Sequence, residues 1–229
     1  MSDRDALLAR VRQASEQGRQ YRVHLEHIPD DTGYVGAGGD LCERLAAEVN
    51  AVGGQAFIVP DPAAAASQLR SLLAEEKAKT AVCWEHELLG RINLTELLRS
   101  AGIDSLDYHK LTALPMDQQR AALLACDIGI TSCDCAIAET GTLMMCSRPG
   151  QERVASLLPP MHIAIIERHQ IVPDLIDAFN QIQNPKSQIQ YLPSNVTFIT
   201  GPSKTGDIEL QLTTGVHGPG KWRVIVIDG

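Results

Sequence analysis

Short apolar runs alternate with longer segments of helical periodicity along most of the chain. The longer segments carry apolar residues every three or four positions, which predicts helices at 3–20, 40–52, 62–79, 94–100, 116–125 and 172–183. The short runs predict strands at 55–59, 80–84, 105–108, 127–132, 136–138, 142–146, 161–167, 195–200 and 222–227.

This alternation is typical of the α/β class. It predicts a mainly parallel central sheet with helices on both faces, because parallel strands need helical crossovers. Glycine at 141 between two short apolar runs indicates local antiparallel pairing around 140–146 within that sheet. We expect residues 1–34 to form an N-terminal helical arm and linker, and residues 35–229 to form one α/β domain.

Composition narrows the classes of function. The chain has 229 residues, 44% of them hydrophobic, which is enough for one large core and argues against disorder. The net charge of -8 and the low aromatic content argue against nucleic-acid binding. No apolar run reaches the length of a membrane span, and the first residues lack the plan of a signal peptide, so we expect a cytoplasmic protein.

The cysteines are predicted to be reduced thiols in the core. Six cysteines in a chain of this length, without a signal peptide, do not indicate a disulfide framework. Four of them fall between 126 and 146: Cys126, Cys133, Cys135 and Cys146. Only Cys133 and Cys135 are closely spaced, and no second pair follows at a fitting interval, so neither a metal site nor any other cofactor site is predicted.

Histidines and tryptophans give weaker signals than the loops described next. His86 follows a strand but belongs to no spaced pair of metal ligands. His162 lies in an apolar strand and is predicted to be a core residue. Trp84 and Trp222 are predicted to pack at strand ends.

The turn at Glu139-Thr140-Gly141-Thr142 is the first candidate site. A carboxylate interrupts an apolar run, and two hydroxyl residues flank a glycine that can adopt a positive φ. Glu139 can face a ligand there, or the segment can be a structural hairpin in which Glu139 is solvated or accepts from turn N–H groups. The residues alone leave both open.

The loop after the strand at 195–200 is the second candidate. Lys204 can pair with an anion, and the hydroxyls of Ser203 and Thr205 lie between two glycines, Gly201 and Gly206. The alternative is a solvated turn in which Lys204 pairs with an acidic neighbour. The two acidic candidates are Asp207 and Glu209. The spacing does not match a P-loop.

The third candidate lies just before the last strand. His217 stands beside Gly218 in a glycine- and proline-rich segment, so it can approach a ligand closely and exchange a proton near neutral pH. A turn in which the histidine only bonds neighbouring carbonyl groups fits the same residues equally well.

These three motifs, at 137–142, 201–209 and 215–219 and followed by an apolar strand, resemble those of the lactate-utilisation protein C family, whose module is called the LUD domain. The resemblance covers about residues 35 to 229. It implies a fold group that includes ribose-5-phosphate isomerase, glucosamine-6-phosphate deaminase, CoA transferases and 5-formyltetrahydrofolate cyclo-ligase. It also implies a part in the oxidation of L-lactate to pyruvate beside iron–sulfur oxidoreductase-like partner proteins. This chain lacks a C-x-x-C-x-x-C run, so it is expected to be an accessory component without clusters of its own.

The resemblance and the loops together predict that the chain binds a small anionic metabolite. The predicted binding residues are Thr140, Gly141, Thr142, Gly201, Ser203, Lys204, Thr205, Asp207, Glu209, His217 and Gly218, with Glu139 as the candidate catalytic group. Two alternatives remain open. The first is an independent isomerase, CoA-transferase or cyclo-ligase that uses Glu139 as base or nucleophile. The second is a non-catalytic interaction subunit.

Overall fold

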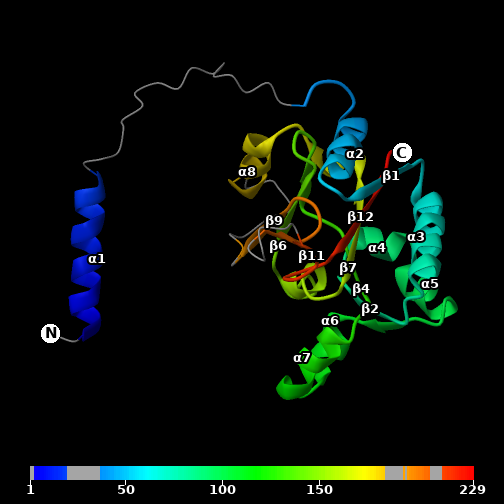
Figure 1. Ribbon diagram of the computed structural model, residues 1–229, viewed down its shortest axis with the longest axis horizontal. Coiled ribbons are helices and arrows are strands. Elements are labelled where there is room, and N and C mark those ends of the chain that lie inside the picture. Colours follow the sequence, from blue (N-terminus) through cyan, green and yellow to red (C-terminus); the bar gives the residue numbers. More distant parts are fainter. Residues whose placement is uncertain (1–2, 20–36, 184–192, 194, 207–212) are drawn as a thin grey trace. The chain divides into compact units, whose positions relative to one another are not determined.

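The computed structural model describes residues 3–19, 37–183, 193, 195–206 and 213–229. The chain divides into two units, Met1–Val35 and Gly36–Gly229. The first contains helix α1 (Asp3–Arg19), which confirms the helix predicted at the N-terminus. The second contains all the other elements (Figure 1).

The second unit contains every other helix and strand predicted from the sequence, together with short elements that were not predicted. The helices are α2 (Leu41–Ala51), α3 (Pro62–Glu76), α4 (Glu87–Arg91), α5 (Leu94–Ser100), α6 (Tyr108–Ala113), α7 (Met116–Leu124) and α8 (Leu175–Gln183), with 3-10 turns η1 (Arg153–Ser156) and η2 (Arg168–Gln170). The strands are β1 (Gln55–Val59), β2 (Thr80–Cys83), β3 (Asp104–Leu106), β4 (Ile128–Thr131), β5 (Cys135–Ile137), β6 (Thr142–Cys146), β7 (Met161–Glu167), β8 (Ile171–Val172), β9 (Val196–Ile199), β10 (Lys204–Thr205), β11 (Thr213–Thr214) and β12 (Lys221–Ile227). The helices and strands that were not predicted are α4, α6, β8, β10 and β11.

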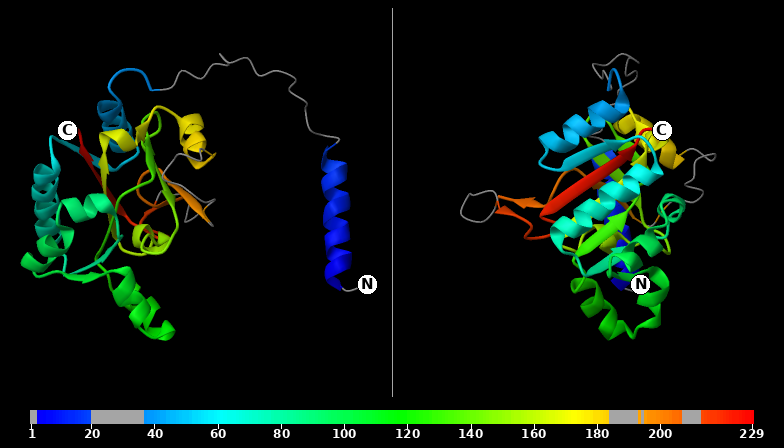
Figure 2. Two further views of the ribbon diagram at one scale, coloured as in Figure 1. Left: turned by 180° about the vertical axis from the view of Figure 1, so that it is seen from behind. Right: turned by 90° about the vertical axis from the view of Figure 1, so that its right-hand side faces the viewer.

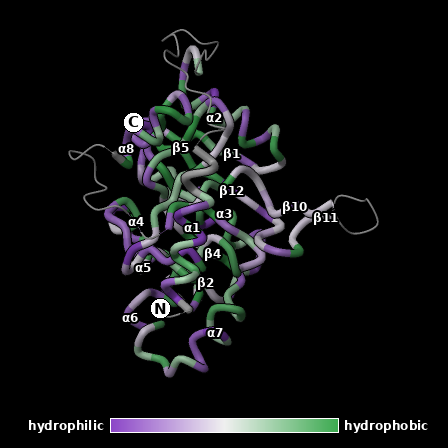
Figure 3. Tube along the Cα trace, turned by 90° about the vertical axis from the view of Figure 1, so that its left-hand side faces the viewer, coloured by the Kyte–Doolittle hydropathy of each residue, from purple (hydrophilic) through white to green (hydrophobic). Residues whose placement is uncertain are grey.

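Six strands form an all-parallel sheet in the order β1-β12-β7-β4-β2-β3, which confirms the α/β fold class. Helices α3 and α5 lie on one side of this sheet (Figures 1 and 2). The apolar colour in Figure 3 follows β4 and β2 through the middle of the unit. Buried isoleucines of β4, β7 and β12 supply much of this core.

A second sheet of four strands, in the order β8-β5-β6-β9, lies on the other side of the parallel sheet (Figure 1). The antiparallel pairing predicted near Gly141 exists between β5 and β6, but it belongs to this separate sheet and not to the parallel one. The helix–strand alternation did not predict this layer, because β5 and β8 have only three and two residues and show no measurable period.

Capping residues explain two boundaries that differ from the predictions. Helix α8 begins at Leu175 and not at 172, because residues 171 and 172 form strand β8 and the Asp174 side chain caps the helix by accepting a hydrogen bond from the Asp177 N–H at 2.8 Å. Strand β3 ends at Leu106, because Asp107 caps α6 through the Lys110 N–H at 2.8 Å.

Candidate functional site

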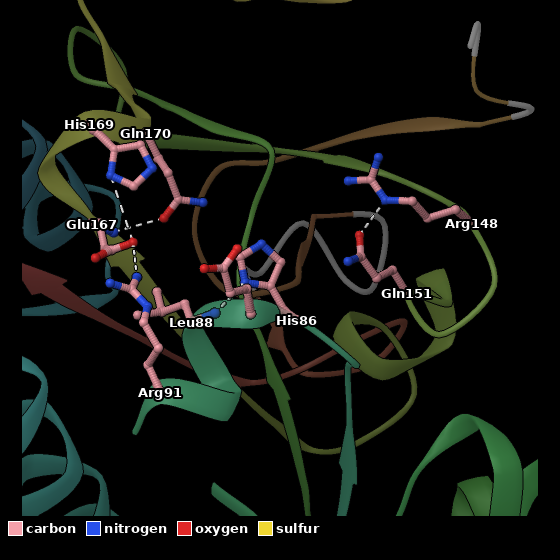
Figure 4. A pocket seen from close by; sticks show the side chains of 9 residues that line it. His86, Leu88, Arg91, Arg148, Gln151, Glu167, His169 and Gln170 are labelled. Carbon is pink, nitrogen blue, oxygen red and sulfur yellow. Dashed lines mark hydrogen bonds and ion pairs between the residues drawn. The ribbon is translucent and has the colours of Figure 1, made fainter. Parts of the chain in front are cut away.

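The carboxyl edge of the parallel sheet holds a polar cavity of about 560 Å3. Residues that follow β2, β6 and β7 line it, which places it where open α/β sheets bind ligands. The lining residues are His86, Glu87, Leu88, Arg91, Arg148, Gln151, Glu167, His169 and Gln170 (Figure 4).

Arg148 forms one wall of the cavity and is held by two partners. Its Nη2 pairs with Asp134, whose side chain is only 3% exposed and also accepts a hydrogen bond from the Cys146 N–H at 2.6 Å. Its Nε donates to Gln151 Oε1 at 2.5 Å. Within the described residues these bonds occupy Nη2 and Nε, so Nη1 remains to donate to a ligand.

Arg91 forms the opposite wall together with the residues at the end of β7 (Figure 4). Its guanidinium pairs with Glu167, and His169 Nδ1 lies 3.7 Å from the same carboxylate. Gln170 holds Glu167 in a capping box, in which the Glu167 N–H donates to Gln170 Oε1 at 2.8 Å. The Arg91 guanidinium is thus fixed at the carboxyl edge of the parallel sheet.

His86 lies between the two walls and presents a donor (Figure 4). Its Nδ1 accepts a hydrogen bond from the Leu88 N–H at 3.2 Å, which caps the first turn of α4. Burial lowers the pKa of His86 below its ordinary value, so the ring is neutral at pH 7. A neutral imidazole whose Nδ1 accepts carries its proton on Nε2, and we assign that tautomer from this bond.

The cavity therefore combines two guanidinium groups with a neutral imidazole donor. Arginine recognises carboxylates through parallel N–H donors, and an imidazole N–H can donate to a hydroxyl or keto oxygen. Glu167 is already paired with Arg91, which reduces its repulsion of an anion. The arrangement suits a small carboxylate that carries a further oxygen able to accept a hydrogen bond.

The Glu139 turn lies elsewhere, against helix α2. Gly141 has φ +64°, and a Cβ there would lie 2.7 Å from the Val49 backbone nitrogen, so the glycine is required by the packing. Thr142 Oγ1 lies 2.7 Å from Thr140 Oγ1 and 2.7 Å from Thr200 Oγ1. These hydroxyls join the first predicted motif to Thr200, the residue directly before the second motif. The Glu139 N–H donates to the Pro173 carbonyl at 3.1 Å.

The second motif also contacts the end of α2. Lys204 Nζ donates to the Val52 carbonyl at 2.6 Å, a bond typical of a cation at a helix C-terminus. A Cβ at Gly201 would lie 3.0 Å from the same carbonyl oxygen. Thr205 lies in β10. Asp207 and Glu209 lie outside the described residues.

Four of the predicted residues meet in a second cavity. Gly201, Ser203, His217 and Gly218 line a space of about 230 Å3 near the amino ends of β7 and β12. The Ser203 N–H donates to the Pro219 carbonyl at 2.8 Å, which joins the second and third motifs. The structure thus brings the three motifs into contact, but not around the arginine cavity.

Sequence reasoning did not predict His86, Arg91, Arg148 and His169 as site residues. Their position in the sequence could have indicated a site, because residues 85–87 and 167–170 are polar stretches directly after strongly apolar strands. Open α/β sheets bind ligands beyond the carboxyl ends of such strands. Arg148 had no such signal, since it follows a strand of the second sheet.

All six cysteines are free and buried, which confirms that they are reduced core residues. Burial raises the pKa of Cys146 and Cys135 to about 12, so neither forms a thiolate readily. Within the described residues, no group of three or more His, Cys, Asp or Glu side chains is placed to hold a metal ion.

Comparison with known proteins agrees with the fold and with the resemblance to the LUD domain. Residues 42–227 match the LUD domain family. Lactate utilization protein C of Geobacillus sp. (strain WCH70) is 32% identical over 98% of this chain and 95% of that protein. Lactate utilization protein C of Anoxybacillus flavithermus is 30% identical over 97% of this chain and 98% of that protein. Within the described residues, every helix is too short or too polar to cross a membrane.

A solved structure shares the fold. The crystal structure of a DUF162 family protein from Deinococcus radiodurans matches with a TM-score of 0.57 over 82% of this chain and 96% of that one. The sequences are 19% identical, so this likeness supports the fold alone.

Proposed function

The chain belongs to the LUD domain family, and with lactate utilization protein C among its relatives over nearly full length we propose that it is a cytoplasmic component of L-lactate utilisation. Its role is to bind the small 2-hydroxy or 2-oxo carboxylate in the cavity between Arg91 and Arg148. The observation that carries this proposal is the pairing of two fixed guanidinium groups with the neutral donor His86 at the carboxyl edge of the sheet.

The chemistry of L-lactate matches the cavity group by group. Its carboxylate can accept from Arg148 Nη1, and its hydroxyl oxygen on the adjacent carbon can accept from His86 Nε2. Pyruvate presents a keto oxygen at the same position, so the same donors serve substrate and product. His86 donates from Nε2, which makes it a positioning group for this oxygen and not a base in this tautomer.

The oxidation itself is assigned to a complex and not to this chain alone. Conversion of L-lactate to pyruvate removes two electrons and two protons, and we propose that iron–sulfur oxidoreductase-like partner proteins accept the electrons. The buried thiols of this chain, with their raised pKa values, support an accessory role.

Calorimetric titration with L-lactate and with pyruvate tests the site. Arg148→Lys keeps a positive charge beside the buried Asp134 but removes the planar guanidinium and its parallel N–H donors. Arg91→Gln removes the other guanidinium of the cavity. Each variant is expected to weaken binding about tenfold or more, because a charge-assisted hydrogen bond contributes roughly 1.5–3 kcal/mol. Arg99→Gln, which removes an exposed arginine paired with Glu96 outside the cavity, serves as the matched control.

The three motifs predicted from the sequence to bind the ligand form a competing location, which we call the predicted cleft. One variant distinguishes the predicted cleft from the arginine cavity. Lys204→Met removes the bond to the Val52 carbonyl without touching the arginine cavity. We expect L-lactate affinity within twofold of that of the unmodified protein. A tenfold loss in Lys204→Met together with unchanged affinity in both arginine variants would move the site to the predicted cleft.

A further inference from the structure

Two side chains on neighbouring strands of the parallel sheet, Trp222 and His162, lie at the floor of the second cavity. Trp222 on β12 and His162 on β7 are register partners, so they project from the same face of the sheet. Gly129 on β4 lies opposite His162. A Cβ at Gly54 would lie 2.6 Å from Trp222 Cε3. Because Cε3 and Nε1 lie on opposite edges of an indole, Nε1 is turned away from β1.

Both floor residues are buried, and each has a nitrogen without a partner. Trp222 is 1% exposed and His162 is 0% exposed. Within the described part of the chain, neither Trp222 Nε1 nor His162 Nδ1 makes a hydrogen bond. His162 Nε2 does have a partner, the Thr131 hydroxyl at 2.8 Å. Buried polar groups are nearly always satisfied, so two adjacent exceptions on one cavity floor indicate a polar occupant.

The chemistry of the lining narrows the class of that occupant. Trp222 Nε1 can only donate, whereas His162 Nδ1 donates or accepts according to its tautomer. Among the described residues, the cavity lining contains no Lys, Arg, Asp or Glu side chain, so a charged group there would meet no counter-charge from them. Phe198, Ile199 and Leu157 add an apolar wall. The space of about 230 Å3 exceeds what one water molecule needs, which is about 10–15 Å3 by this measure.

We infer that this cavity is a second binding site, for a small uncharged molecule that carries a carboxamide or similar carbonyl group on an apolar body. The carbonyl oxygen accepts from Trp222 Nε1, and the amide group satisfies His162 Nδ1 in either tautomer. The inference does not depend on the arginine cavity, because the two cavities share no lining residue.

Indole NMR signals of the full chain test the inference with benzamide as the probe. The chain has two tryptophans, and Trp84 Nε1 donates to the Glu152 carbonyl at 2.9 Å, so its signal is an internal reference. We expect a saturable change of the Trp222 indole N–H signal with benzamide and no change of the Trp84 signal. Benzoate and benzylamine, which have the same ring with a charged group, are expected to bind at least tenfold more weakly.

Two variants complete the test. Trp222→Phe assigns the signal, and Ser203→Leu narrows the cavity without altering either floor nitrogen. Ser203→Leu is expected to weaken benzamide binding at least tenfold, as judged from the same signal. The inference is overturned if the Trp222 signal does not respond, if both indole signals move together, if the charged probes bind as well as benzamide, or if Ser203→Leu has no effect.

Discussion

Gly129→Ala is expected to lower the free energy of unfolding by about 3 kcal/mol or more, the upper range for overpacking a core. A Cβ at this position would lie 1.7 Å from the Ala155 carbonyl oxygen, which is backbone and cannot rotate away. Strand β4 is bonded to β2 and β7 on its two sides, so it cannot shift without breaking one of the two ladders. Urea denaturation measures the effect as a lower midpoint.

Gly90→Ala is the matched control for this prediction. Gly90 lies in helix α4, and a Cβ there meets no atom within 4 Å. The same substitution is therefore expected to stabilise the protein slightly, by up to about 1 kcal/mol, because alanine favours the helix over glycine. Equal midpoints for Gly129→Ala and the unmodified protein would show that η1 can move away from β4 at little cost.

The close approach at Gly129 also illustrates what the sequence could predict. The order of helices and parallel strands followed from periodicity, because long amphipathic segments and buried apolar runs such as β7 leave a clear pattern. The second sheet left no such pattern, since its strands are short and pair with segments far away in the chain, such as β6 with β9. The approach of η1 to Gly129 left no pattern either, because it joins two segments 26 positions apart, Gly129 and Ala155.

The candidate site shows the same limit. Sequence motifs selected loops whose glycines are required for packing on α2, as Gly141 shows. The cavity residues His86 and Arg91 follow β2, whereas Arg148 comes from the loop after β6 in the other sheet. Arg148 and His86 are 62 positions apart, and no local spacing relates them. Their meeting depends on how the two sheets pack.

Acidification is expected to destabilise the protein through His162. Burial lowers the pKa of His162 from 6.5 to about 3, because the charged ring would lose its water without gaining a carboxylate partner. In the unfolded chain the ring takes up a proton below about pH 6.5, whereas in the folded protein it stays neutral down to about pH 3. Unfolding therefore binds a proton in this window, and the free energy of unfolding falls as pH falls, by up to about 1.4 kcal/mol per pH unit.

His162→Gln isolates this contribution. Glutamine cannot titrate but keeps a side-chain amide within reach of the Thr131 hydroxyl, and other titrating groups are common to both proteins. The variant is expected to be less stable at pH 7, and its deficit should shrink by about 2 kcal/mol between pH 7 and pH 5, as measured by urea denaturation at each pH. Parallel profiles for His162→Gln and the unmodified protein would mean that the folded state protonates His162 as readily as the unfolded chain does.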